Sequence, residues 1–232
     1  MKNLITVNFN YEFEVTVNLS KDGPINCTLT KWIVSIIKKF IEICPNPFPT
    51  GVYNINIYYR PQGPFACIHC NEHIEYDIGL QVNTAENVKE VIYQLGHELC
   101  HFYSDARRSS WFGESCCMMT SYILLHEISK IDFNSNVVEF KKWFSDNKEE
   151  IIKNPHEQKN IEKIARVIYP LFAGSLDNLA VLNYLGKAYN PPASRLDECD
   201  SNYTVSFDFN LWLRAVPDRY KDFIKQIITM FE

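Results

Sequence analysis

The stretch that decides the fold is Val91-Ile-Tyr-Gln-Leu-Gly-His-Glu-Leu-Cys-His-Phe-Tyr103. Its apolar residues recur at intervals of three and four, which predicts one amphipathic helix. On a helix, His97 and His101 lie one turn apart, about 6 Å along the axis, and point the same way. Two imidazoles in this arrangement can bind one Zn²⁺ ion, and Glu98 lies where its carboxylate can reach a water molecule on that ion.

A catalytic zinc ion needs three protein ligands and one open position. Glu114, thirteen residues after His101, is the candidate third ligand, because helical spacing of apolar residues resumes there. A short connection over 104–112 would let this second helix fold back, so that Glu114 faces both histidines. Asp105 is the alternative, but along an unbroken helix it would lie about 12 Å from His97. We therefore expect Glu114 to complete the site.

This pattern resembles the gluzincin kind of zinc metallopeptidase, in which an HExxH helix is followed by a ligand Glu on the next helix. The motifs lie between Val88 and Leu125, and the short spacer is closest to compact gluzincins and to peptidases that cleave phage-type repressors. The resemblance implies that Glu98 acts as general base and then as proton donor. Many gluzincins place an Asp four residues after the ligand Glu, where it supports the first histidine, but this chain has Met118. Support must come from elsewhere, with Asp105 or a backbone carbonyl as candidates.

The order of expected elements is typical of an α+β chain. Alternating apolar residues predict strands, and three- and four-residue spacing predicts helices. The strands are expected over 5–19 (one strand or two), 52–59, 65–70 and 73–83, and the helices over 28–43, 84–103, 140–152, 161–172, 176–189 and 209–231, the last broken at Pro217.

The resemblance implies a zincin-like arrangement of these elements. Residues 1–110 would form a sublobe with a twisted mixed sheet, a backing helix and the active-site helix. Residues 111–232 would form a mostly helical sublobe that carries the third ligand, within one integrated catalytic domain. The strand from His73 to Asn83 is expected to border the cleft and to bind an extended substrate through its free edge.

Composition and charge exclude several classes of function. The chain has 232 residues and a formal net charge of −5, and it contains no basic stripe, so we expect no nucleic-acid partner. No segment has the apolar core of a signal peptide or the length of a membrane span, which predicts a cytoplasmic protein without a membrane partner. The eight cysteines are then expected to be reduced thiols that pack as small apolar groups.

Other chemically capable residues have weaker patterns. The stretch Cys67-Ile-His-Cys-Asn-Glu-His73 contains four possible soft ligands (two Cys and two His), but no second ligand pair accompanies it, so loop and packing roles are favoured. The identity of the residue that donates to the developing oxyanion is left open, and most of the candidates must be structural. These candidates are Tyr103, Tyr122, His126, Tyr169, Tyr184, Tyr189 and Tyr203, with Arg195 as a candidate for binding a substrate carboxylate.

The sequence thus predicts a zinc-dependent peptidase with one Zn²⁺ ion and a peptide or protein substrate. The predicted metal ligands are His97, His101 and Glu114, and the predicted catalytic residue is Glu98. The alternative is a non-catalytic binding or regulatory module on a zincin fold, with structural or absent zinc. Its expected sign is a closed fourth coordination position, filled for example by Cys100, Asp105 or a C-terminal side chain. A third interpretation is an accidental motif in a helical interaction protein.

Overall fold

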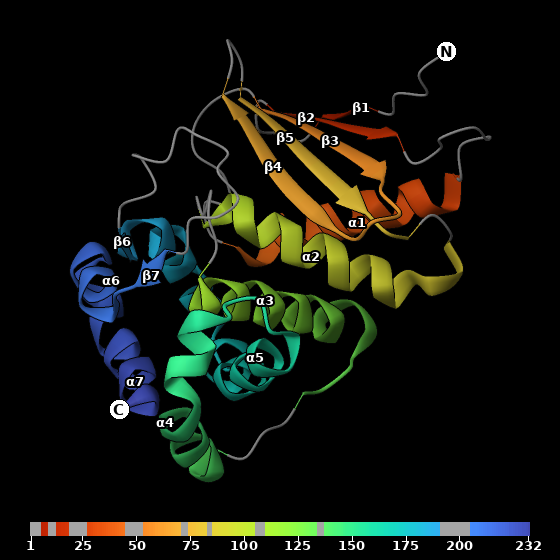
Figure 1. The fold of residues 1–232 in the computed structure, drawn as a ribbon. Helices are drawn as coiled ribbons and strands as arrows, with labels where there is room; N and C mark the ends of the chain where they lie inside the picture. The colour runs from red at the N-terminus through yellow and green to blue at the C-terminus, as the bar shows by residue number, and fades with distance from the viewer. Residues whose placement is uncertain are drawn as a thin grey trace.

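The protein is a mixed α+β structure with one five-stranded sheet and a large helical part. The computed structural model describes residues 6–8, 13–18, 27–44, 53–70, 74–82, 85–104, 110–133, 137–190 and 205–232. Helices α1 (Cys27–Ile43) and α2 (Val88–Tyr103) lie together under the sheet in the view of Figure 1, and the remaining helices lie beyond α2. One continuous core of buried apolar side chains runs from α1 and the sheet to the last helix.

The sheet has the strand order β1-β2-β3-β5-β4. Strands β2, β3 and β5 are parallel to one another, and β1 and β4 run antiparallel to their neighbours. The strands are β1 (Thr6–Asn8), β2 (Phe13–Asn18), β3 (Tyr53–Tyr59), β4 (Phe65–Cys70) and β5 (Ile74–Leu80). The alternating stretch over 5–19 is therefore two antiparallel strands, which is one of the two expected forms.

The sheet order corrects the expectation of a free edge at His73 to Asn83. The strand in this stretch, β5, is bonded on both sides, in parallel to β3 and antiparallel to β4. Only three residues separate β4 from β5, and such a short connection permits only an antiparallel hairpin. The returning strand then takes the place beside β3. Among the described strands, the edge on this side of the sheet belongs to β4.

Helix α3 (Trp111–Ser129) lies between α2 and α5 (Gln158–Ala173), and every residue from Trp111 to Leu125 is buried. Its contact with α2 is close because Gly96 lies at the crossing. A Cβ at position 96 would lie 2.7 Å from Leu124 Cδ1 and 3.3 Å from Ser121 Cα. Ser121 Oγ also donates a hydrogen bond to the carbonyl oxygen of Tyr93 at 2.7 Å. These contacts set the position of α3 against the HExxH helix.

The second half of the chain is helical, as expected. The expected helix over 176–189 is a 3₁₀ helix, and the last expected helix is interrupted at Pro217 as predicted. Among the described residues, no helix combines the length and the apolar character needed to cross a bilayer. These elements are α4 (Val137–Lys153), α5, the 3₁₀ helix Leu176–Ala188, the antiparallel pair β6 (Tyr189–Asn190) and β7 (Ser206–Phe207), α6 (Phe209–Ala215) and α7 (Lys221–Phe231).

Aromatic rings anchor the start of α3 to the C-terminal helices. Trp111 packs against Phe144 of α4 with 5.4 Å between ring centroids, and Phe112 packs against Phe209 of α6 at 5.0 Å. Both rings also lie 5.6 Å from Phe231 of α7. Because such pairs add to the free energy of simple burial, the first turn of α3 is held firmly in place.

Replacing Gly96 with Ala is expected to lower the free energy of unfolding by about 1–3 kcal/mol, because the new methyl group overpacks the contact with α3. Urea-induced unfolding measures the change. Gly174→Ala is the comparison: a Cβ there would lie 3.2 Å from the carbonyl oxygen of Pro170, but at an exposed helix end and not in a helix crossing, so a smaller loss of stability is expected. Equal stability of the Gly96→Ala protein and the wild type would contradict the close crossing of α2 and α3.

Candidate metal centre

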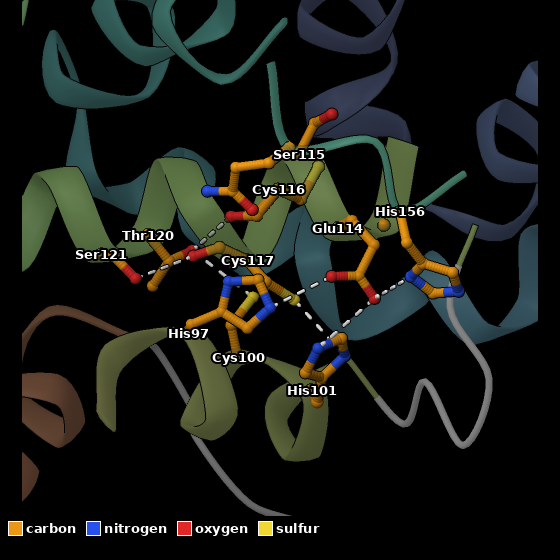
Figure 2. A network of polar contacts seen from close by, with 12 residues as sticks. His97, Cys100, His101, Glu114, Ser115, Cys116, Cys117, Thr120, Ser121 and His156 are labelled. Carbon is orange, nitrogen blue, oxygen red and sulfur yellow. Dashed lines mark hydrogen bonds and ion pairs between the residues drawn. The ribbon is translucent and has the colours of Figure 1, made fainter. Parts of the chain in front are cut away.

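The end of α2 and the first turn of α3 bring the three predicted ligand side chains together (Figure 2). Glu114 Oε2 lies 3.1 Å from His97 Nε2, and Glu114 Oε1 lies 3.7 Å from His101 Nε2. The two imidazole rings are 4.9 Å apart between centroids. Only 17%, 14% and 11% of the side-chain surfaces of His97, His101 and Glu114 are exposed. Two nitrogen donors and a carboxylate therefore converge in a partly desolvated space.

The position of Glu114 follows from how α3 begins. Ser110 is the N-cap residue, and its hydroxyl accepts a hydrogen bond from the backbone N–H of Gly113 at 3.1 Å. The N–H of Glu114 donates to the carbonyl oxygen of Ser110 at 2.9 Å. Gly113 has no side chain, so the phenol of Tyr189 can pack directly against the helix. The cap fixes the first turn, and the first turn directs Glu114 at the histidines.

The two imidazoles of this site have very different pKa values. Burial acts to lower the pKa of His97, but the hydrogen bond and the charge of Glu114 outweigh it and raise this pKa to about 9. Burial lowers the pKa of His101 to about 4, with Glu114 opposing the shift and His97 adding to it. Without a metal ion, the proton on His97 places a positive charge beside the Glu114 carboxylate.

Glu98 is the buried carboxyl group closest in sequence to the histidines, and only 4% of its surface is exposed. Burial raises its pKa to about 7, with His97 opposing the shift and Glu114 adding to it. The guanidinium of Arg60 also acts on it, in the direction of the charged form. A carboxyl group with a pKa near neutrality can both accept and donate a proton under ordinary conditions.

Cys117 is a potential metal-binding residue that the sequence analysis missed. Ligand atoms of His97, His101 and Cys117 all lie within 4.8 Å of one another, so this group could bind a metal ion. Cys117 Sγ lies 3.5 Å from His101 Nδ1. The signal for it was present, because Cys117 follows Glu114 by three residues and so shares its face of the helix. The sequence analysis instead named Cys100 as a possible extra ligand.

His156 also reaches the site, from the connection between α4 and α5 (Figure 2). Its Nδ1 lies 3.9 Å from Glu114 Oε1, and 69% of its side chain is exposed. The sequence analysis did not consider this histidine, since no local pattern relates it to the HExxH helix. Its contact with Glu114 exists only through the packing of the helical half against α3.

The described candidates for the oxyanion donor lie in structural contacts. Tyr103 packs edge-on against Phe40, Tyr122 and Tyr169 contact Phe133, Tyr184 contacts Lys187, and His126 pairs with Asp132 at 2.9 Å. The remaining candidate, Tyr189, is fully buried. Asp105, His73, Arg195 and Tyr203 lie outside the described residues. Cys44, Cys100, Cys116 and Cys117 are buried thiols, as expected for a reduced chain.

Zinc binding near pH 7 is expected to release about one proton per ion, because the ion must displace the proton on His97. The apparent zinc affinity should therefore rise as the pH rises toward about 9 and then level off. Titration calorimetry in two buffers with different ionisation enthalpies counts the protons. In metal-free Glu114→Gln protein, an NMR titration should show His97 deprotonating at a lower pH, since its main raising influence is gone. An unchanged titration would contradict the pairing of His97 with Glu114.

Two imidazoles and a carboxylate form a donor set that suits zinc and related divalent ions. The described residues thus contain one group that could bind a metal ion, His97, His101 and Cys117, with Glu114 in contact with both histidines. Comparison with protein-family models, with curated proteins and with solved structures finds no match for this chain. The arrangement of the side chains themselves is therefore what points to a function.

Proposed function

We propose that the protein is a zinc-dependent peptidase of the gluzincin kind. His97, His101 and Glu114 bind one Zn²⁺ ion and leave one position open, which is the ligand count of a catalytic zinc. The observation that carries the proposal is the approach of the Glu114 carboxylate to both histidines, at 3.1 and 3.7 Å. A carboxylate that served only to pair with a charged histidine would need to approach one ring, not two.

Glu98 is the proposed general base and proton donor. A bound Zn²⁺ ion would lower the pKa of a water molecule to about 7 and would polarise the carbonyl group of the substrate. Glu98 takes a proton from the attacking water and delivers it to the leaving amine. Its burial supports this role, because a pKa of about 7 lets the same carboxyl group perform both transfers.

The arrangement of elements supports a zincin-like fold. Two strands, the backing helix α1, three further strands of the same sheet, the HExxH helix α2 and the ligand-bearing helix α3 follow one another in the expected order. The role first expected of His73 to Asn83 passes to β4. The outer edge of β4 faces no other strand among the described residues. Helix α2 contacts strand β4. We place the peptide or protein substrate along this edge, as an added antiparallel or parallel strand.

The proximity of Cys117 to both histidines suggests a second candidate function. If its Sγ joined the three proposed ligands, the zinc ion would have four protein ligands and no open position. The zinc would then be structural, and the protein would be a binding or regulatory module without hydrolytic activity. The contact to Nδ1 of His101, rather than to the Nε2 that faces Glu114, favours the peptidase.

Metal analysis and a digestion assay test the proposal together. Protein purified without added zinc is analysed for metal, and a peptide library is then digested with and without a chelator. About one zinc ion per chain together with chelator-sensitive cleavage supports the peptidase. Bound zinc without cleavage supports the binding or regulatory module. If the purified protein still binds no metal after zinc is added to it, both candidate functions are contradicted.

A further inference from the structure

We infer that Cys117 is a positioning residue of the metal centre: its Sγ accepts a hydrogen bond from Nδ1 of His101 and so keeps Nε2 of that ring directed at the metal. This inference rests on the metal site proposed above. It concerns a residue that neither the HExxH motif nor the downstream Glu would assign.

The two nitrogens of His101 face different partners. Nδ1 lies 3.5 Å from Cys117 Sγ, whereas Nε2 lies 3.7 Å from Glu114 Oε1. A neutral imidazole carries one N–H, and a partner that accepts it at Nδ1 leaves the lone pair of Nε2 for the metal. Metal-binding histidines almost always use their second nitrogen in this way, with a carboxylate, a carbonyl or water as the acceptor. In this chain the acceptor is a thiol.

The position of the thiol is itself fixed. Cys117 is fully buried and is hydrogen-bonded to Cys100 of α2. Cys100 Sγ lies 3.4 Å from the hydroxyl of Thr120, and that hydroxyl donates to the carbonyl oxygen of Cys116 at 2.9 Å. Figure 2 shows Cys100, Cys117 and Thr120 beside the histidines. This series of contacts crosses the interface of α2 and α3 and ends on a backbone carbonyl, so the thiol cannot easily turn away from His101.

Helix α3 therefore provides both a ligand and the support of another ligand. Glu114 and Cys117 are three residues apart, so both point toward α2 from the same face of the helix. The resemblance to gluzincins left the support of the histidines unassigned, because position 118 is Met118. Cys117, the residue before Met118, provides that support, and it does so for His101, the second histidine of the motif.

Zinc affinity of matched variants tests the inference. Cys117→Ala removes the acceptor and should weaken zinc binding by about 10–100-fold, the usual cost of losing such a partner. Cys116→Ala is the control, since it removes the same atoms from the adjacent, equally buried position and should keep the wild-type affinity. Cys117→Ser retains an acceptor and should lie between the wild type and Cys117→Ala. Competition with a chromogenic chelator measures all three dissociation constants.

Two measurements on the wild type do not depend on the folding of any variant. In zinc-loaded protein, ¹⁵N NMR should show the proton of His101 on Nδ1. The cobalt-substituted protein should show no thiolate-to-metal charge-transfer band, because Cys117 lies outside the coordination shell. A strong band would make Cys117 a ligand and overturn the inference.

The possible failures are distinguishable. Wild-type protein that binds zinc while Cys117→Ala and Cys116→Ala bind it equally well would overturn the positioning role and leave the proposed function intact. Wild-type protein that binds neither zinc nor cobalt would overturn the proposed function itself, and the positioning role with it.

Discussion

Glu98→Gln protein is expected to retain about one zinc ion per chain and to lose about 10²- to 10⁴-fold in kcat/KM for peptide hydrolysis. The side chain contributes no atom to the group that holds the ion, so the metal content should not change. Gln has nearly the same shape as a protonated Glu but cannot accept the proton of the attacking water. Elemental analysis and initial rates on one cleavable peptide measure the two properties in the same preparation.

The matched control is Glu90→Gln, two turns earlier on the same helix. Glu90 accepts a hydrogen bond from Gln94 at 2.7 Å and has no contact with the histidines in the described structure. The same chemical change at this position should leave both zinc content and kcat/KM near their wild-type values. Full activity of Glu98→Gln protein would end the proposed mechanism, whatever its zinc content.

The pKa of Glu98 gives a second check on this variant. Burial raises this pKa to about 7, whereas an unfolded chain titrates near 4.3. Between these values the folded protein binds more protons than the unfolded chain, so this group reduces stability progressively as the pH rises through them. Gln stays neutral. Above about pH 7, metal-free Glu98→Gln protein should therefore have a Tm at or above that of metal-free wild type. A Tm below that of metal-free wild type would show that Glu98→Gln protein loses activity because it is less stable, and not because it lacks the general base.

The convergence of His97, His101 and Glu114 was predictable because it depends on short-range geometry. One helical turn relates the two histidines, and a short connection can only bring the next helix back against the first. Cys117 follows from the same geometry, but cysteine also packs well as an apolar group, and the sequence does not distinguish the two uses. His156 has no such relation to the motif, since its position depends on how α4 and α5 pack.

The wrong prediction of a free strand edge at His73 to Asn83 has a different cause. Alternating residues from Ile74 to Leu80 show that the strand has one buried face, and the structure confirms buried Tyr76, Ile78 and Leu80. Alternation describes the two faces of a strand and contains no information about its two edges. The hairpin between β4 and β5 determines the neighbours of β5, because it places β5 between β4 and β3. Sequence periodicity could not have predicted that exchange of edge.

His97→Ala protein is expected to lose zinc, with an affinity more than about 100-fold below wild type, since even the loss of a partner behind a ligand costs about 10–100-fold. It should also be inactive. The same substitution removes the positive charge that lies 3.1 Å from the carboxylate of Glu114, a residue that is only 8% exposed. Breaking a buried pair from one side costs about 3–5 kcal/mol of stability. Two separate losses are therefore expected, one of metal and one of folding free energy.

The double variant His97→Ala/Glu114→Gln separates these two losses. It also neutralises the carboxylate that has lost the charge of His97, so the unfolding free energy should recover toward that of metal-free wild type, while zinc binding should stay lost. His126→Ala is the control for removing a histidine, because His126 pairs with Asp132 away from the site and should leave zinc content unchanged. If His97→Ala protein retains about one zinc ion per chain by elemental analysis, the ion is bound elsewhere, and His97 is not the ligand that the short contact with Glu114 implies.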